Sequence, residues 1–317
     1  MAFPADSILP APATLPAVPG WALPRGPVED LTEAAYMAGA ALNCLDNLVR
    51  ADPPWAGAWR QRVALNAAAS AARLLGHRED SAALRDAWHL RPAGADPGPA
   101  GNLLAAWRRL ASRSPILDLE GLRSLTNLLG LAWTPALEVL PEAVEDAASS
   151  GAPAPLAAAA AAGAVGAVTS GTEALAWWIA DLTLARRMRW PIPVPVLATQ
   201  IHARVLRSAP GGRRYRPGGE GGEAALCLAA AAGAAEACRL AHEIAGRAER
   251  LGAVAPKLRA KGAGEAIALL LDDDAVQGAL TTPSLSRWAS RRLFERLAAL
   301  DAVRELSGRS TFRLYGL

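Results

Sequence analysis

The sequence predicts an all-α fold, in which a multi-helix body is followed by a C-terminal unit that carries a short β-hairpin. Hydrophobic residues make up 52% of the chain, but much of this fraction is alanine, and ten tryptophans stand against only three phenylalanines and three tyrosines. Such a composition favours closely packed helices over β-sandwiches. Apolar residues also recur at helical spacing between connections rich in proline and glycine. The length of 317 residues exceeds a typical domain of about 100–200 residues and predicts more than one compact unit.

Residues 1–27 are predicted to form an extended leader, because prolines punctuate the whole segment. It lacks the basic region followed by an apolar region that marks a secretion signal. The three cysteines, Cys44, Cys227 and Cys238, show neither a disulfide framework nor metal-ligand spacing. We therefore expect a reducing, cytoplasmic location, with the cysteines buried as small hydrophobic residues.

The helical body is expected to span residues 28–206. Its first helix, residues 28–50, begins with acidic residues, repeats apolar residues at helical spacing, and is ended by two prolines. Residues 55–76 and 78–90 predict two more helices, and the short connections favour antiparallel neighbours. After further helices, prolines alternate with apolar residues over 191–195 and predict an extended connection.

A linker or mobile loop is predicted over residues 207–222, which hold six glycines, two prolines and four arginines. The arginines can reach phosphates, although a basic loop is more often simply solvated. Residues 223–255 have strong helical character and are predicted to form a connecting helix.

Neither the net charge nor the hydropathy of the chain indicates a particular partner or a membrane. The net charge of +3 is too small to indicate one. Lys257 and Lys261 are the only lysines, so the arginine excess is better explained by a GC-rich genome than by phosphate binding. The most apolar stretch, residues 152–185, consists mainly of alanine and glycine interrupted by polar residues, and it predicts a buried helix pair and no membrane span.

Enzyme motifs are absent from the sequence. It has no phosphate-binding loop, nucleophile elbow, zinc-protease helix or paired-cysteine motif. Asp272, Asp273 and Asp274 are consecutive, but neighbouring residues on a helix diverge by about 100°, so they are not expected to converge on one ion. We expect these aspartates to form a solvated helix end. The sequence therefore predicts no catalytic residue, no metal site and no cofactor.

The C-terminal unit, residues 256–317, shows a specific order of elements. The patterns predict a helix over 264–272, a short helix over 275–280, a turn, a long helix over 286–300, and two strands, "VREL" and "TFRLY", joined by the tip "SGRS". Helix, helix, turn, helix and β-wing is the order of a winged helix-turn-helix.

The long helix of this unit has two different faces. Steps of about 100° per residue predict a core stripe, formed by Ala289, Leu293, Leu297 and Leu300. Arg287 and Arg291 fall on the opposite face, and Arg292 on its flank. From Ser284 to the end of the chain, seven arginines stand against three acidic residues, a net charge of +4. The predicted DNA-binding residues are Ser286, Arg287, Arg291, Arg292, Arg309 and Arg313.

Two functions follow from this charge distribution. In the first, the protein binds double-stranded DNA mainly through phosphates, as a transcriptional or replicon-associated regulator, and the helical body forms a homodimer or senses an effector. In the second, the protein is a non-enzymatic scaffold whose wing docks a partner protein at an interface centred on Trp288 and Phe294. An enzyme would require a cleft with converging titratable groups.

Two resemblances accompany these patterns. The stretch "SRWASRRLFERLAALDAVRELSGRSTFRLYGL" resembles the C-terminal winged helix of Fic-associated and MarR-like proteins, but the His-Pro-Phe motif of Fic catalysis is absent. From about Trp21 to Leu317 the chain is similar to the alphaproteobacterial domain of unknown function family 1403, through "LARRMRWPIPVPVLA", "APKLRAKGA" and "LLLDDDAV". This resemblance carries over no activity, cofactor or catalytic residue, and it implies at most a regulatory or replicon-associated context.

Overall fold

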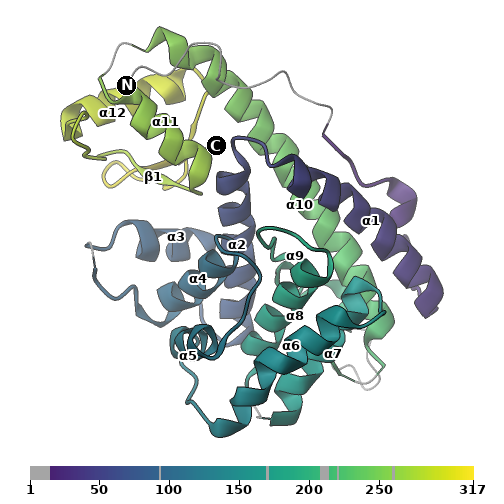
Figure 1. Cartoon of the computed structure of the whole chain (residues 1–317). Coiled ribbons are helices and arrows are strands. Elements are labelled where there is room, and N and C mark those ends of the chain that lie inside the picture. Colours follow the sequence, from purple (N-terminus) through teal and green to yellow (C-terminus); the bar gives the residue numbers. More distant parts are fainter. Residues whose placement is uncertain (1–14, 93, 169–170, 208–213, 220, 259–260) are drawn as a thin grey trace.

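The computed structural model describes all residues except 1–14, 93, 169–170, 208–213, 220 and 259–260. In this part of the chain, twelve α-helices accompany one small three-stranded sheet, as the predicted all-α class requires (Figure 1). The helices are α1 Leu31–Ala51, α2 Ala56–Leu74, α3 Ser81–His89, α4 Gly98–Leu110, α5 Leu119–Leu128, α6 Leu140–Ser149, α7 Ala154–Val168, α8 Glu173–Arg187, α9 Val196–Thr199, α10 Glu223–Val254, α11 Ala263–Asp272 and α12 Arg287–Ala299. The strands are β1 Val276–Gln277, β2 Arg304–Glu305 and β3 Leu314–Gly316.

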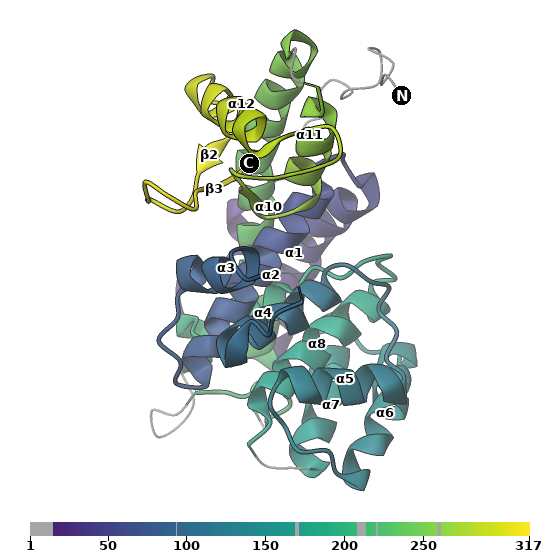
Figure 2. The same ribbon diagram turned by 90° about the vertical axis from the view of Figure 1, so that its left-hand side faces the viewer.

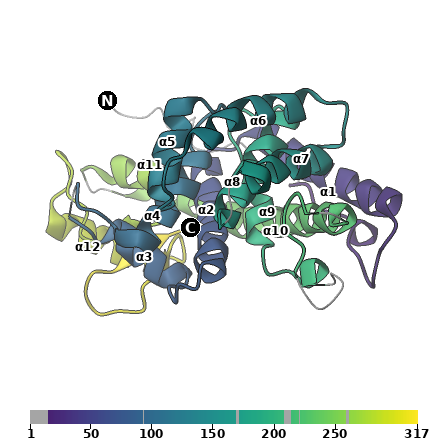
Figure 3. The same ribbon diagram turned by 90° about the horizontal axis from the view of Figure 1, so that it is seen from below.

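The helix α2 is central to the molecule. It packs against α3, α4, α9, α10 and α11, while α1 lies along α10 and α7 along α8. Alanine fills most of the buried face of α2, so neighbouring helices approach closely. Viewed from below, α12 and α1 lie at opposite ends of the molecule (Figure 3).

Buried tryptophans join helices that are distant in the sequence. The indole Nε1 of Trp59 in α2 donates to the carbonyl of Ala237 in α10 at 2.9 Å. Trp178 in α8 donates to the carbonyl of Ala106 in α4 at 3.0 Å. Because each indole N–H has a partner, these large side chains are buried without an unpaired polar group.

The segment after α8 leads into the short helix α9 without helical structure over 191–195, as the alternating prolines predict. Asp181 in α8 is fully buried, and its carboxylate accepts from the backbone N–H groups of Leu197 and Ala198 at 2.7 and 3.0 Å. Burial raises the pKa of Asp181 to about 8, whereas the two backbone hydrogen bonds lower it. The carboxyl thereby fixes the first turn of α9 against α8.

The long helix α10 belongs to the core. Together with the turn that follows it, this helix (Glu223–Lys257) is long and apolar enough to cross a membrane, but 72% of its most apolar window is buried inside the protein. A core helix of a soluble protein has the same character. Two cysteines on its buried face, Cys227 and Cys238, have pKa values raised by burial to about 11 and about 12.

Part of the predicted leader and linker lies outside the described residues. Within the leader, a 3-10 turn at Gly20–Ala22 buries Ala22, and Trp21 stacks on Tyr36 of α1. Within the linker, Arg214 forms an ion pair with Glu173 of α8. Both segments therefore make contacts with the helical body.

The C-terminal unit contains the only strands of the described chain. They form an antiparallel sheet in the order β1-β3-β2, with Val276 opposite Tyr315 and Glu305 opposite Tyr315 from the other side. The predicted hairpin is confirmed, with shorter strands: β2 covers the middle of "VREL", and β3 begins at Leu314, so the first three residues of "TFRLY" lie outside it. Figure 2 shows the hairpin between them above α3.

The short helix predicted over 275–280 is wrong, because β1 occupies this segment. Val276 is buried and Gln277 is exposed, which is the alternation of a strand. Periodicity over so short an apolar run does not distinguish a helix from a strand. The pairing with β3, which lies almost 40 residues later, decides the outcome.

Candidate functional site

The helix α12 has one face exposed to solvent, which includes Arg287, Trp288 and Arg292. Ser286 is the N-cap residue, and its hydroxyl accepts from the backbone N–H of Ala289 at 3.3 Å. The opposite face is buried through Ser290, Leu293, Phe294 and Leu297. Phe294 stacks on Tyr315 of β3 with ring centroids 5.0 Å apart, which fixes α12 against the sheet.

Two expectations for this helix need correction. Leu300, expected in the core stripe, is 45% exposed, because α12 ends at Ala299 and the chain turns away there. Phe294, expected at the centre of a protein interface, is fully buried against the sheet and cannot contact a partner. Trp288, the other residue of that interface, is 71% exposed.

Three of the predicted arginines meet at one surface pocket. Arg287 and Arg291 come from the exposed face of α12, one helical turn apart, and Arg313 comes from the residue directly before β3. The pocket has a volume of about 270 Å³. It is also lined by Gly278, Ala279, Glu295, Ser310, Thr311, Phe312 and Tyr315. Three guanidinium groups against the carboxylate of Glu295 leave it positive.

Large aromatic side chains flank this pocket. Phe312 lies in its lining and is 69% exposed. The guanidinium of Arg291 lies 5.4 Å from the ring centre of Trp288, within cation–π range. The surface between α12 and the hairpin therefore combines positive charge with exposed rings.

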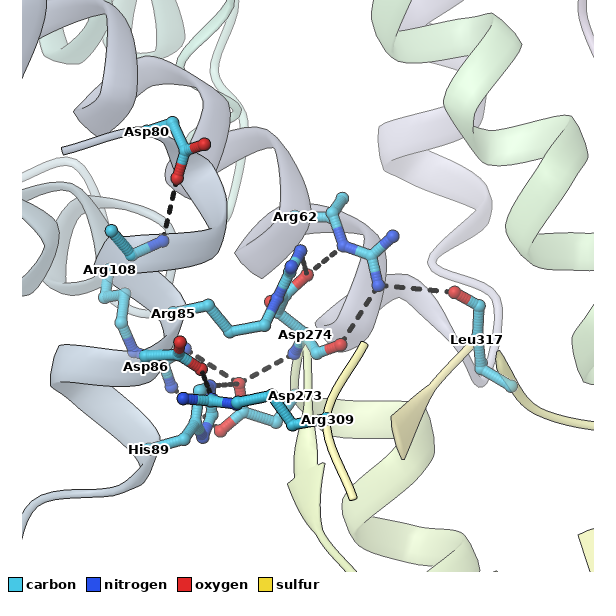
Figure 4. Close-up of polar contacts among 11 residues, drawn as sticks. Arg62, Asp80, Arg85, Asp86, His89, Arg108, Asp273, Asp274, Arg309 and Leu317 are labelled. Carbon is cyan, nitrogen blue, oxygen red and sulfur yellow. Dashed lines mark hydrogen bonds and ion pairs between the residues drawn. The ribbon is translucent and has the colours of Figure 1, made fainter. Parts of the chain in front are cut away.

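The remaining predicted arginines lie outside the pocket. Arg292 is exposed on α12 but does not line the pocket. Arg309, at the tip of the hairpin, forms an ion pair with Asp86 of α3 (Figure 4). The backbone carbonyl of Arg309 accepts from Nε of Arg313 at 3.0 Å. Arg309 thus attaches the tip to the helical body, while residues 310–313, which follow it, are exposed to solvent.

The three consecutive aspartates have a role that the sequence did not reveal. The expectation of a solvated helix end is wrong for Asp274, which is 2% exposed. Its carboxylate pairs with Arg62 of α2 and with Arg85 of α3, the latter at 2.5 Å (Figure 4). Asp273 forms a two-pronged ion pair with Arg108 of α4, at 2.7 and 2.9 Å. Arginines from three helices of the body therefore hold the end of α11.

We call the ion pairs of Asp273 and Asp274 with the body the joint. Further contacts add to it. Arg62 also donates to the backbone carbonyls of Asp274 and Leu317, at 3.0 and 3.3 Å. Burial, with a smaller contribution from nearby Arg85, lowers the pKa of Arg62 to about 9, so Arg62 keeps its charge at neutral pH. His89 lies with Nε2 3.9 Å from the carboxylate of Asp273.

His89 is held in its neutral form. Its pKa is lowered to about 4, mainly by burial; Asp273 opposes this shift, and Arg108 and Arg85 contribute to it. Arginine and aspartate residues far apart in the sequence build this environment, so no local motif signals it. In the sequence, the only indication of these ion pairs is the run of three aspartates directly after an apolar helix, in a chain whose basic side chains are nearly all arginine.

Among the described residues, no group of three or more histidine, cysteine or acidic side chains is arranged to hold a metal ion. The pocket at α12 offers cations and hydroxyl groups, which suit the binding of an anion.

Comparison with known proteins gives one match. A family model described as "Protein of unknown function (DUF1403)" matches residues 8–317. Neither a curated protein nor a solved structure matches the chain. The whole-chain resemblance to this family is confirmed. The alphaproteobacterial origin and the resemblance of the C-terminal segment to Fic-associated and MarR-like winged helices stay predictions.

Proposed function

The chain belongs to the family described as protein of unknown function DUF1403, and we propose that it binds double-stranded DNA through its C-terminal unit. The observation that carries the proposal is the convergence of Arg287, Arg291 and Arg313 on one pocket. Guanidinium groups pair with phosphate oxygens in two-pronged geometry, and phosphate contacts supply most of the affinity of proteins for DNA.

The order of elements supports the same proposal. Helix α11, strand β1, helix α12 and the hairpin β2–β3 follow one another, and the sheet has the order β1-β3-β2. A winged helix has a comparable succession, with its last helix as the reading element. In place of a second helix this chain has a turn, closed by the bridge between Thr282 and Leu285. We propose a winged-helix module with a shortened middle element.

The hydroxyl groups near the arginines add hydrogen-bonding capacity. Ser310 and Thr311 line the pocket on the hairpin side. Ser286 caps α12, whose N-terminal end carries partial positive charge. Such groups contact DNA phosphates and set the register of the protein on the duplex. A regulatory or replicon-associated role, a cytoplasmic location and a homodimeric body are proposed together with DNA binding.

A protein-docking role is the second candidate function. Trp288 and Phe312 are 71% and 69% exposed, and large exposed aromatic residues beside arginine are frequent at the centres of protein interfaces. A partner protein seated there would bind with little dependence on salt, whereas DNA binding weakens steeply as salt rises.

Binding of a fluorescently labelled duplex, followed by anisotropy, tests the proposal. Arg287→Ala, Arg291→Ala and Arg313→Ala should each weaken binding by roughly 3- to 10-fold, because each removes a guanidinium group that pairs with phosphate. Arg292→Ala is the matched control, since Arg292 is an exposed arginine of the same helix outside the pocket. Equal losses of affinity in all four variants would contradict a role for the pocket.

A further inference from the structure

We infer that Phe312 inserts between neighbouring base pairs of the bound duplex, as a wedge carried by the hairpin. The inference rests on the proposed DNA binding and assigns a role to one residue within it. Phe312 lines the pocket formed by Arg287, Arg291 and Arg313, and its side chain is 69% exposed. An apolar ring therefore stands in solvent among three positive charges.

The backbone of Phe312 is strained. Its φ angle is 53°, in the left-handed region that side chains other than glycine, asparagine and aspartate seldom adopt. A bulky residue keeps such a conformation only when its surroundings impose it, and strain of this kind gathers at functional sites. Burial of the ring does not offset the energetic cost of this backbone conformation, because most of the side chain is exposed to solvent.

Hydrogen bonds anchor the backbone of the residues that follow Phe312. The carbonyl of Arg313 accepts from the backbone N–H of Gly278 at 2.8 Å, and the backbone N–H of Leu314 donates to the hydroxyl of Ser307 at 3.3 Å. Leu314 then enters β3. The backbone is thus anchored directly after Phe312, and the side chain of Phe312 stays 69% exposed at the pocket.

The charge around the ring identifies its partner. Arginine side chains on both sides, from α12 and from the hairpin, suit a polyanion that passes over the pocket. In DNA, the apolar surface within reach of phosphate-bound arginines is the stack of bases. Proteins that place phenylalanine between base steps unstack them and bend the duplex. Phe312 has the exposure, position and electrostatic surroundings for this role.

Fluorescence of 2-aminopurine tests the insertion, since this base brightens when it is unstacked. The probe is a duplex of ~20 base pairs that carries 2-aminopurine at alternate adenines. The full-length protein should raise its fluorescence on binding. Phe312→Ala should abolish the rise and weaken binding by roughly 10-fold. Ile116→Ala, which shortens another 69%-exposed apolar side chain outside the pocket, should leave both quantities unchanged.

A second variant separates function from folding. Phe312→Gly places glycine where φ is positive and should not lower the thermal midpoint of unfolding, yet it should abolish the fluorescence rise. An unchanged affinity and fluorescence rise in Phe312→Ala would overturn the wedge while DNA binding stands. Binding by the parent protein without any fluorescence rise would also overturn it. No binding by the parent at low salt would overturn the proposed function itself.

Discussion

Asp274 illustrates how one residue can hold two parts of the protein together. Its buried carboxylate forms ion pairs with the guanidinium groups of Arg62 and Arg85, which come from two different helices of the body. Removing one partner of a buried ion pair is costly, because the charges left behind remain desolvated. At this position a polar side chain is as important for the packing as any apolar one.

Asp274→Asn should lower the free energy of unfolding by about 3 kcal/mol, because it leaves the charges of two buried arginines without a counterion. Urea unfolding followed by circular dichroism measures this change. The control is Asp272→Asn, which alters an exposed aspartate two positions away and should change stability by less than about 0.5 kcal/mol. Equal effects of the two substitutions would contradict the joint.

His89 predicts a pH dependence of stability. The unfolded chain binds a proton at this imidazole near pH 6.5, whereas the folded protein binds it only near pH 4. Between these values the unfolded state holds more protons, so stability is complete above pH 6.5 and falls as the pH drops toward 4. The decrease amounts to roughly 3 kcal/mol. In His89→Gln, this part of the pH dependence should disappear from a series of urea titrations; an identical pH profile would refute a buried neutral histidine.

At the scale of elements, the close contact between α2 and α11 requires a glycine, Gly57, at the point where the two helices meet. A Cβ added to Gly57 would lie 2.7 Å from the Cα of Asp272, a backbone atom that cannot move without displacing α11. Gly39 also lies in a helix, but a Cβ added there meets open space. We therefore expect alanine to change the stability of the protein in opposite directions at these two positions.

Gly57→Ala should destabilise the protein by about 1–3 kcal/mol, because the added methyl group separates α11 from α2. Gly39→Ala should stabilise it by up to about 1 kcal/mol through the higher helix propensity of alanine. Thermal unfolding of both variants gives the comparison. A stabilised Gly57→Ala protein would show that the helices do not approach as closely as described.

Elements with long periodic patterns were predictable from the sequence. The helices α1, α2 and α10 follow directly from apolar spacing and from the prolines and glycines around them. The strand β1 was not predictable, because its partner β3 is distant in the sequence. The sequence also did not show which of the six predicted DNA-binding residues line the pocket. Arg309 forms an ion pair with Asp86 of α3, and helical geometry alone cannot show this.

At the scale of the whole molecule, the C-terminal unit is attached at one end of the helical body and presents its charged pocket outward. The joint at Asp273 and Asp274, the ion pair of Arg309 and the packing of Gly57 all lie on its inner side. The pocket is lined by α12, by Gly278 and Ala279 after β1, and by residues 310–313 of the hairpin, directly after Arg309.

The measurement that tests this account most directly is the salt dependence of duplex binding. Affinity is measured from ~50 to ~200 mM salt for the parent protein and for the variant in which Arg287, Arg291 and Arg313 are all alanine. We expect the logarithm of the parent's affinity to fall linearly with the logarithm of the salt concentration. The slope should decrease by about 0.9 for each phosphate that the variant no longer neutralises, or roughly 2.7 for all three arginines. A parent protein whose binding is insensitive to salt, or a variant with the same slope as the parent, would contradict DNA binding at this pocket.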